Sequence, residues 1–222
     1  MVNSSETHWH KPHEGEHRLS VSLSVVLVIA LQFLLPKHLS LGIQKYICLL
    51  EAALLVLLVT LTPRRIGRHH APTRNLSIVL TSVMTVSNIS SAIKLIDGLV
   101  QGSITDANML LLSGGSIWMA NVVIFSLWFW ELDRGGPGAR AEARKPVPDF
   151  LFPQMSSPEY REKGWHPKYF DYLYISVTNA SAFSPTDTAP LSRWAKILMM
   201  MQSLTSLVTV GLVIARAVNI LK

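Results

Sequence analysis

The chain has 222 residues, of which 49% are hydrophobic and only 15% are charged. Charged residues make up about a quarter of an ordinary soluble domain, so this composition excludes that class and indicates an integral membrane protein. The net charge of +6 belongs to loops between apolar runs, so it does not predict nucleic-acid binding. The single cysteine, Cys48, excludes a disulfide within the chain.

The first 18 residues are polar and contain four histidines, at positions 8, 10, 13 and 17. Only the last three would share one face of a helix. Neutral imidazole binds zinc and other transition metals, so one interpretation of the segment is a metal site. We favour the other interpretation, a solvated tail without a metal, because Pro12 and Gly15 interrupt the segment.

Two apolar runs follow this tail, Leu19–Leu35 and Tyr46–Thr62, and we predict that both are transmembrane helices. Pro36 and Pro63 follow the runs directly, and a proline just beyond a helix end is a stop signal. The acidic residue Glu51 lies inside the second run. A charged residue inside a span is a candidate for function or for pairing with another charge.

The third predicted span, Leu76–Val100, is the most polar one. Its polar residues recur at steps of three and four positions and therefore form one stripe along a helix. They are Ser77, Thr81, Thr85, Asn88 and Ser91. Small polar residues commonly form hydrogen bonds between membrane helices, which is the interpretation that we favour for the stripe. The alternative is the wall of a polar cavity.

Charges inside the second and third spans predict an ion pair. The two spans run antiparallel because the short loop 63–75 joins them. At about 1.5 Å per residue, Glu51 and Lys94 then lie about 8–10 Å below the same membrane surface. An unpaired charge at that depth costs about 2–3 kcal/mol or more. We therefore expect Glu51 and Lys94 to pair, with Asp97 competing one turn nearer the water.

The fourth predicted span, Asn108–Glu131, ends in Trp128-Phe-Trp130, which is typical of an aromatic belt at a membrane interface. The loop 132–168 that follows is rich in Gly and Pro. Within this loop, Asp149–Pro153 is apolar enough to pack on the membrane surface or under the helix that comes after the loop.

That next segment, Tyr169–Ala182, is apolar and aromatic, yet it is too short to cross a hydrocarbon layer of about 30 Å, which needs roughly 20 helical residues. A run of small polar residues and Pro190 separate it from a last apolar run, Leu191–Leu221. We predict a re-entrant helix, whose chain returns as extended backbone to the side from which it came. Such backbone is tolerated at membrane depth only where protein or water satisfies its polar groups.

The order of parts in residues 169–222 resembles the pore loop of the potassium-channel superfamily. In that comparison Ser176 and Thr178 fall in the pore helix, and Ala182-Phe-Ser-Pro-Thr186 falls on the selectivity filter. Asp187 falls on the aspartate after the filter and Pro190 on the proline that opens the inner helix. Ser184 and Thr186 replace two filter glycines, however, and Pro185 between them has a fixed φ and no N–H.

The same C-terminal part is similar to an uncharacterised family of small bacterial multispanning membrane proteins, which supplies no function. The pore-loop resemblance implies a cation-permeable channel that is not selective for potassium. It implies that the pore is lined by Thr178, Asn179, Ser181, Phe183, Ser184, Pro185, Thr186 and Asp187. The polar stripe Gln202, Ser206 and Thr209 would line the pore from the last helix. The alternative is a small secondary transporter, or an accessory membrane protein, with a non-conducting loop.

We therefore predict an all-α integral membrane protein with about five transmembrane helices and a re-entrant helix before the last. Its parts are a polar tail (1–18), a four-helix bundle (19–131), a loop (132–168) and the pore-loop region (169–222). The segments 1–18, 63–75 and 132–168, with Arg193 and Lys196, carry 15 of the 20 Lys and Arg residues. Cytoplasmic loops are the basic ones, so we expect a cytoplasmic N-terminus and a re-entrant loop that enters from the cytoplasm.

Several further expectations follow from the same residues. A channel of this kind would be a homo-oligomer, a tetramer by the resemblance, in the bacterial inner membrane. Its partners would be lipid and inorganic ions. The sequence contains no Gly-rich phosphate loop, no metal-ligand motif in a span and no Ser/His/Asp constellation at matched depth. We therefore expect neither an enzyme nor a bound cofactor.

Overall fold

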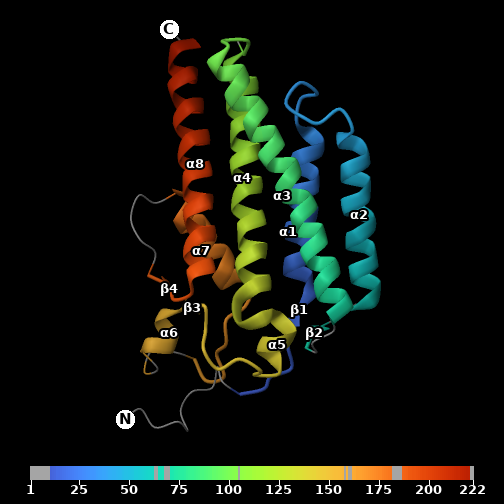
Figure 1. The fold of residues 1–222 in the computed structure, drawn as a ribbon, viewed down its shortest axis with the longest axis vertical. Coiled ribbons are helices and arrows are strands. Elements are labelled where there is room, and N and C mark those ends of the chain that lie inside the picture. Colours follow the sequence, from blue (N-terminus) through green and yellow to red (C-terminus); the bar gives the residue numbers. More distant parts are fainter. Residues whose placement is uncertain are drawn as a thin grey trace.

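The computed structural model describes residues 11–62, 65–67, 71–104, 106–157, 159, 162–181 and 187–220. Five long helices form an up-and-down bundle (Figure 1): α1 (Arg18–Leu34), α2 (Gln44–Leu61), α3 (Ala71–Val100), α4 (Ala107–Leu132) and α8 (Arg193–Ile220). The shorter elements are β1 (Glu16–His17), β2 (Arg65–Ile66), η2 (Asp133–Gly135), α5 (Pro137–Ala141), β3 (Phe150–Leu151), α6 (Pro153–Ser156), α7 (Tyr169–Ser181) and β4 (Ala189–Pro190).

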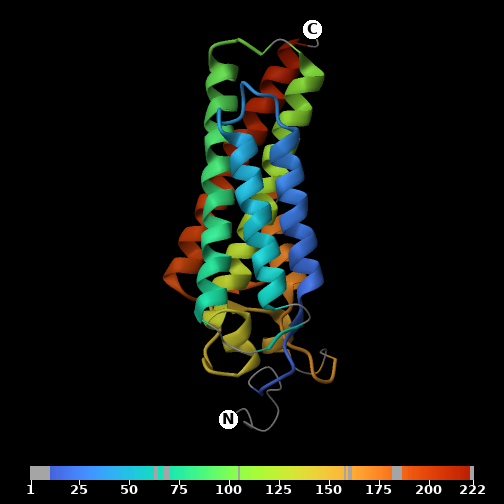
Figure 2. The ribbon, with the colours of Figure 1, turned by 90° about the vertical axis from the view of Figure 1, so that its right-hand side faces the viewer.

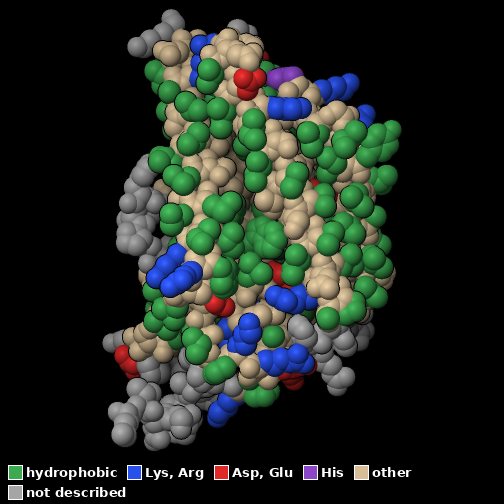
Figure 3. Space-filling model, viewed as in Figure 1, with side chains coloured by type: hydrophobic (Ala, Val, Ile, Leu, Met, Phe, Trp, Pro, Cys, Tyr) green, Lys and Arg blue, Asp and Glu red, His purple; other side chains and the backbone are tan. Residues whose placement is uncertain are grey.

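The helices have the length and the surface of a membrane protein. By length and composition α2, α3, α4 and α8 are each able to cross a membrane, and α1 is a slightly shorter apolar helix of 17 residues. On the face shown in Figure 3, hydrophobic side chains cover much of the surface between the two ends of the molecule. The prediction of an all-helical membrane protein is confirmed at this level.

The arrangement of the helices separates two regions. Helix α4 is central and packs against α1, α3, α7 and α8. Helix α2 packs on α1 and α3 and lies between them at one side of the bundle (Figure 2). We call the end that holds β1, β2 and α5 the N-terminal end of the bundle, and the end at which α8 finishes the C-terminal end.

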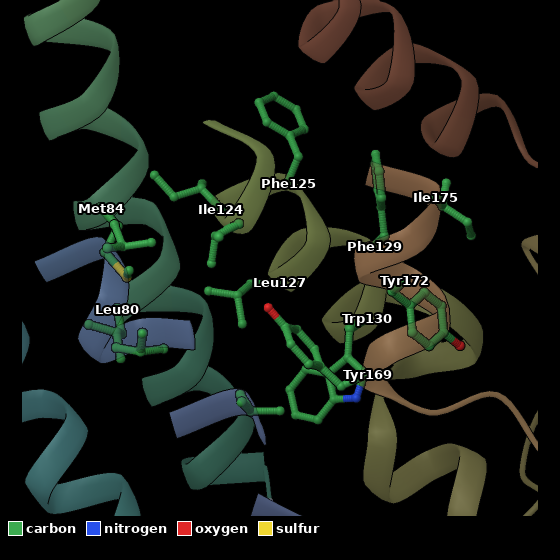
Figure 4. Packing of buried hydrophobic residues seen from close by; sticks show 14 of the residues in the cluster. Leu80, Met84, Ile124, Phe125, Leu127, Phe129, Trp130, Tyr169, Tyr172 and Ile175 are labelled. Carbon is green, nitrogen blue, oxygen red and sulfur yellow. The ribbon is translucent and has the colours of Figure 1, made fainter. Parts of the chain in front are cut away.

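Two apolar clusters form the core. The one nearer the N-terminal end includes Leu80, Met84, Ile124, Phe129 and Tyr172 (Figure 4). The other, nearer the C-terminal end, includes Leu39, Leu95, Leu110, Ile117 and Val213. Gly114 on α4 allows close contact with α8 in this second cluster, because a Cβ there would lie 2.6 Å from a methyl carbon of Val213.

Buried polar residues separate the two clusters along three helices, and we call them the polar layer. They are Gln32 on α1, Ser87, Asn88 and Ser91 on α3, and Gln202, Ser206 and Thr209 on α8. On each helix they come between residues of the first cluster and residues of the second. Buried polar groups in apolar surroundings need hydrogen-bond partners, so the partners of this layer show what it does.

The chain reverses sharply after α4. Arg134, Gly135 and Gly136 have φ values of 52°, 85° and 100°, a left-handed run that favours glycine. The loop then covers the N-terminal end of the bundle, where Phe150–Leu151 of β3 pairs with Ala189–Pro190 of β4. A second short pair joins β1 to β2, so residues 16 and 17 lie against the loop between α2 and α3.

Candidate functional site

The start of α7 is held at the N-terminal end of the bundle by α4 and β1. The Tyr169 backbone N–H donates to the Glu16 carboxylate, which also accepts a bond of 2.7 Å from the Trp130 indole. The Tyr169 hydroxyl lies 2.8 Å from the Ser126 hydroxyl, and the two rings of Trp130 and Tyr169 meet edge to face (Figure 4). These contacts join residues that are up to 153 positions apart.

Two carboxylates, the buried Asp133 and the half-buried Asp149, connect α7 to the start of α8. Asp133 accepts the Tyr172 hydroxyl at 2.6 Å and the Asp149 N–H at 2.9 Å. Asp149 in turn accepts the Trp194 indole at 2.9 Å, and its carbonyl accepts the Leu191 N–H at 2.8 Å. The segment from 169 to 194 therefore begins and ends at the same end of the bundle.

Of the two positions that the sequence left open for the Asp149–Pro153 segment, the structure has the one against the next helix, α7. The rings of Phe150 and Phe152 each meet Tyr172 of α7 edge to face, at centroid distances of 6.3 and 5.5 Å. Asp133 and Asp149 themselves are site residues that the sequence analysis missed. Their only signal is an aspartate on either side of a Gly/Pro-rich stretch, which is common in ordinary turns.

The other end of α7 lies inside the bundle, against the polar layer. Gln202 of α8 donates to the Ser176 carbonyl at 3.0 Å and accepts the Asn179 amide at 2.8 Å. Ser203 donates to the Asn179 carbonyl at 3.1 Å, and Ser206 donates to the Ala180 carbonyl at 2.7 Å. The last carbonyls of a helix lack partners within the helix, so α8 supplies a side-chain cap for the end of α7.

This cap corrects the predicted role of the stripe on α8. Gln202, Ser206 and Thr209 are 0%, 2% and 2% exposed, and the first two bond α7, with Ser206 also accepting the Trp118 indole of α4 at 2.6 Å. Gln202 and Ser206 thus face inward, toward α7 and α4, and all three residues are buried within the chain itself. Helical spacing identified the stripe, but spacing alone does not say toward which neighbour a stripe points.

The described pore-loop candidates have local partners. The Thr178 hydroxyl donates to the Tyr174 carbonyl at 2.9 Å, and the exposed Ser181 donates to the Val177 carbonyl at 2.6 Å. Asp187 is exposed on the returning chain. The remaining candidates, Phe183, Ser184, Pro185 and Thr186, lie outside the described residues.

A pocket of about 250 Å³ opens beside α7 at the N-terminal end. Two carboxylates, Asp171 and Asp187, line it together with α6 and the aromatic residues Phe170 and Tyr174. Asp171 also accepts the Lys168 N–H at 2.7 Å, which caps the start of α7. The pocket therefore places a second acidic residue beside the predicted Asp187.

The predicted pair of Glu51 and Lys94 is wrong. Lys94 donates to the Ser40 carbonyl in the loop between α1 and α2, and Asp97 accepts the Gln101 amide at 2.7 Å. Neither carboxylate oxygen of Glu51 has a hydrogen-bond partner among the described residues. The two side chains do not meet because they point to different places. Lys94 donates its hydrogen bond to the Ser40 carbonyl near the C-terminal end, whereas Glu51 points into the interface of α1, α2 and α3.

The histidines of the N-terminal segment are not gathered around a metal in the described part. His13 stacks on His166 with ring centroids 3.8 Å apart, and its Nδ1 accepts the Gly15 N–H at 3.1 Å. His17 lies in β1, and His8 and His10 lie outside the described residues. Burial and the nearby positive residues His166 and Arg140 lower the pKa of His13 to about 4.

Comparisons with protein-family models, with curated proteins and with solved structures found no match to this chain. The functional inference therefore depends on the geometry of the bundle and of its buried polar groups.

Proposed function

We propose that the chain is a cation-conducting membrane protein of the pore-loop type, with five spans (α1, α2, α3, α4 and α8) and α7 as a re-entrant pore helix. The observation that carries the proposal is the path of the segment 169–194. It enters and leaves at one end of the bundle, and the end of α7 is capped by α8 inside the bundle. The helices α4, α7 and α8 thus have the order of an outer helix, a pore helix and an inner helix.

The dimensions of α7 support this function. Its 13 residues span about 20 Å at 1.5 Å per residue, which is less than a hydrocarbon layer of about 30 Å. A helix that ends in the membrane needs donors for its last carbonyls, and Ser203 and Ser206 supply them. The negative end of the α7 dipole lies inside the bundle, and this polarity favours a cation there.

The charges support an orientation in the cell membrane. The elements at the N-terminal end of the bundle contain Arg18, Arg65, Arg74, Arg134 and Arg140. By the positive-inside rule, that end is cytoplasmic. Helix α7 then enters from the cytoplasm, opposite to the direction in potassium channels. Several subunits, four by analogy with those channels, surround the pore in a bacterial inner membrane.

Two features of the loop indicate which ions the proposed pore conducts. Ser184, Pro185 and Thr186 lack the backbone freedom of filter glycines, so the pore does not select potassium over sodium. Asp187, with Asp171 in the same pocket, concentrates cations at the mouth. Salt screens such an effect.

Cation flux into proteoliposomes that contain the purified protein tests the proposal. The Asp187→Asn variant lowers the flux most at low ionic strength, whereas Glu162→Gln, which removes an exposed carboxylate from the same end, leaves the flux unchanged. A reversal potential that follows the potassium gradient alone contradicts the predicted selectivity. Equal flux for wild type and Asp187→Asn at low salt contradicts the role of Asp187.

One observation favours the second function, a transporter or accessory protein with a non-conducting loop. The polar residues of α8 are used by the α7 cap, and its outward face is apolar, with Ile197, Met200, Leu204 and Leu207 exposed. Such a face suits lipid or a protein contact better than a wet pore. Absence of flux from a purified, folded oligomer in the same assay favours this second function.

A further inference from the structure

Glu51 is a buried acidic residue of α2 in the α1–α2–α3 region. It is 0% exposed, and neither of its carboxylate oxygens has a hydrogen-bond partner among the described residues. None of the ion pairs found among those residues includes it. An ionised carboxylate in such surroundings is strongly unfavourable, while a protonated carboxyl carries no charge.

A polar cluster lies on the side of Glu51 toward the C-terminal end. Gln44, two turns along α2, donates to the Ser87 hydroxyl of α3 at 3.0 Å and to the Gln32 carbonyl oxygen of α1 at 3.4 Å. Gln32 donates to the Met84 carbonyl at 3.2 Å. Cys48 is buried between Gln44 and Glu51 on the same face of α2. These partners satisfy one another and leave none for Glu51.

A cavity lies on the other side, toward the N-terminal end. It has a volume of about 50 Å³ and is lined at its outer part by Arg18, Thr62, Arg74 and Glu131. Its inner part reaches Val25 on α1, Leu58 on α2 and Leu80 on α3. A water molecule needs roughly 10–15 Å³ measured in this way, so the cavity has room for a few. Leu58 is two turns from Glu51 on the same inward face of α2, with the buried Leu55 between them, so the cavity ends short of Glu51, which does not line it.

We propose that Glu51 is a proton-binding site that exchanges its proton with water through this cavity. The resting group is a neutral carboxyl, whose O–H bond breaks when the proton passes to water and forms again when a proton returns. A proton suits the site better than a metal ion, because no group of three or more His, Cys, Asp or Glu residues in the described part of the chain is arranged to hold a metal. The site is separate from α7 and does not depend on the pore proposal.

Infrared spectroscopy of the reconstituted protein tests the protonation state. The spectrum at neutral pH contains the C=O band of a protonated carboxyl without a hydrogen bond, and the nearly isosteric Glu51→Gln variant lacks this band. Glu51→Asp retains a shifted band, and Asp97→Asn, which alters an exposed carboxyl, leaves the band unchanged. A wild-type spectrum that does not differ from that of Glu51→Gln in this region overturns the proposal.

The rate of proton exchange tests the route. After transfer into D2O, the carboxyl band shifts as the proton is replaced by deuterium. Leu58→Phe fills the inner part of the cavity and slows this shift several-fold. The matched control is Leu57→Phe, which changes the neighbouring lipid-facing residue, 46% exposed, and leaves the rate unchanged. Equal rates in the two variants overturn the route through the cavity.

Discussion

The α7 cap and the Glu51 site are two ways in which this bundle buries polar groups. Around α7, side chains of α8 meet carbonyls of the last two helical turns at 2.7–3.1 Å. In the α1–α2–α3 region the amides of Gln32 and Gln44 are paired, but the carboxyl of Glu51, two turns from Gln44 on α2, has no partner among the described residues. Gln202 and Glu51 are both 0% exposed, so the difference lies in the partners and not in the depth of burial.

This difference distinguishes buried polar groups that stabilise the fold from a buried group that is a candidate for proton binding. A satisfied network holds one conformation, because loss of any member leaves other buried groups unpaired. An unpaired carboxyl contributes nothing of that kind to stability, and its persistence in a buried position requires another explanation, such as proton binding. Substitutions that change the polarity of the two sites should therefore have opposite effects on stability.

The largest effect is expected at the cap. Gln202→Leu removes the hydrogen bonds of Gln202 with Ser176 and Asn179 and should lower the free energy of unfolding by about 2–4 kcal/mol. Thermal unfolding of the detergent-solubilised protein measures the loss. The control is Thr205→Val on the same helix, because the Thr205 hydroxyl bonds the Met201 carbonyl of its own helix. Equal stability of the two variants would show that the cap is dispensable.

A smaller effect of opposite sign is expected at Glu51. Glu51→Leu replaces an unsatisfied buried group by an apolar one of similar size and should raise the free energy of unfolding by about 1 kcal/mol. Glu51→Gln should stay close to wild type, since it replaces one neutral polar group by another. The same thermal measurement applies. Destabilisation of both variants would indicate that the Glu51 carboxyl has a partner that holds the bundle together.

The smallest effect concerns His13, which lies outside both regions. Its titration makes the stability of the whole protein depend on pH. Its pKa is about 4 in the folded chain and about 6.5 in an unfolded one, so the unfolded chain binds the extra proton between these values. Stability therefore falls as the pH drops from about 6.5 toward 4, by under about 1 kcal/mol at pH 6. The pH dependence of the unfolding temperature measures this loss.

His13→Asn keeps an acceptor for the Gly15 N–H but does not titrate, so the decline at low pH should be smaller in this variant. His38→Asn changes an exposed histidine at the C-terminal end and should leave the decline as in wild type. If His13→Asn and wild type lose stability in parallel, another group accounts for the decline.

Much of the architecture could be predicted from local patterns. Apolar runs with a proline beyond two of them predicted the long helices, and the short length of Tyr169–Ala182 separated α7 from the spans. The polar stripe on the last helix was also visible, because residues at three- and four-residue steps share a face whatever surrounds the helix. These features depend on neighbours in the chain, and the structure has them close to the predicted positions.

Only the tertiary structure decided which partner each polar residue meets. Periodicity defines the angle between residues around one helix, but it does not define how that helix is rotated toward its neighbours. Gln202 and Ser206 therefore turned out to cap α7, and Lys94 turned out to bond Ser40 and leave Glu51 alone. Contacts such as that of Glu16 with Tyr169, 153 positions apart, arise from packing between distant segments, which no local pattern records.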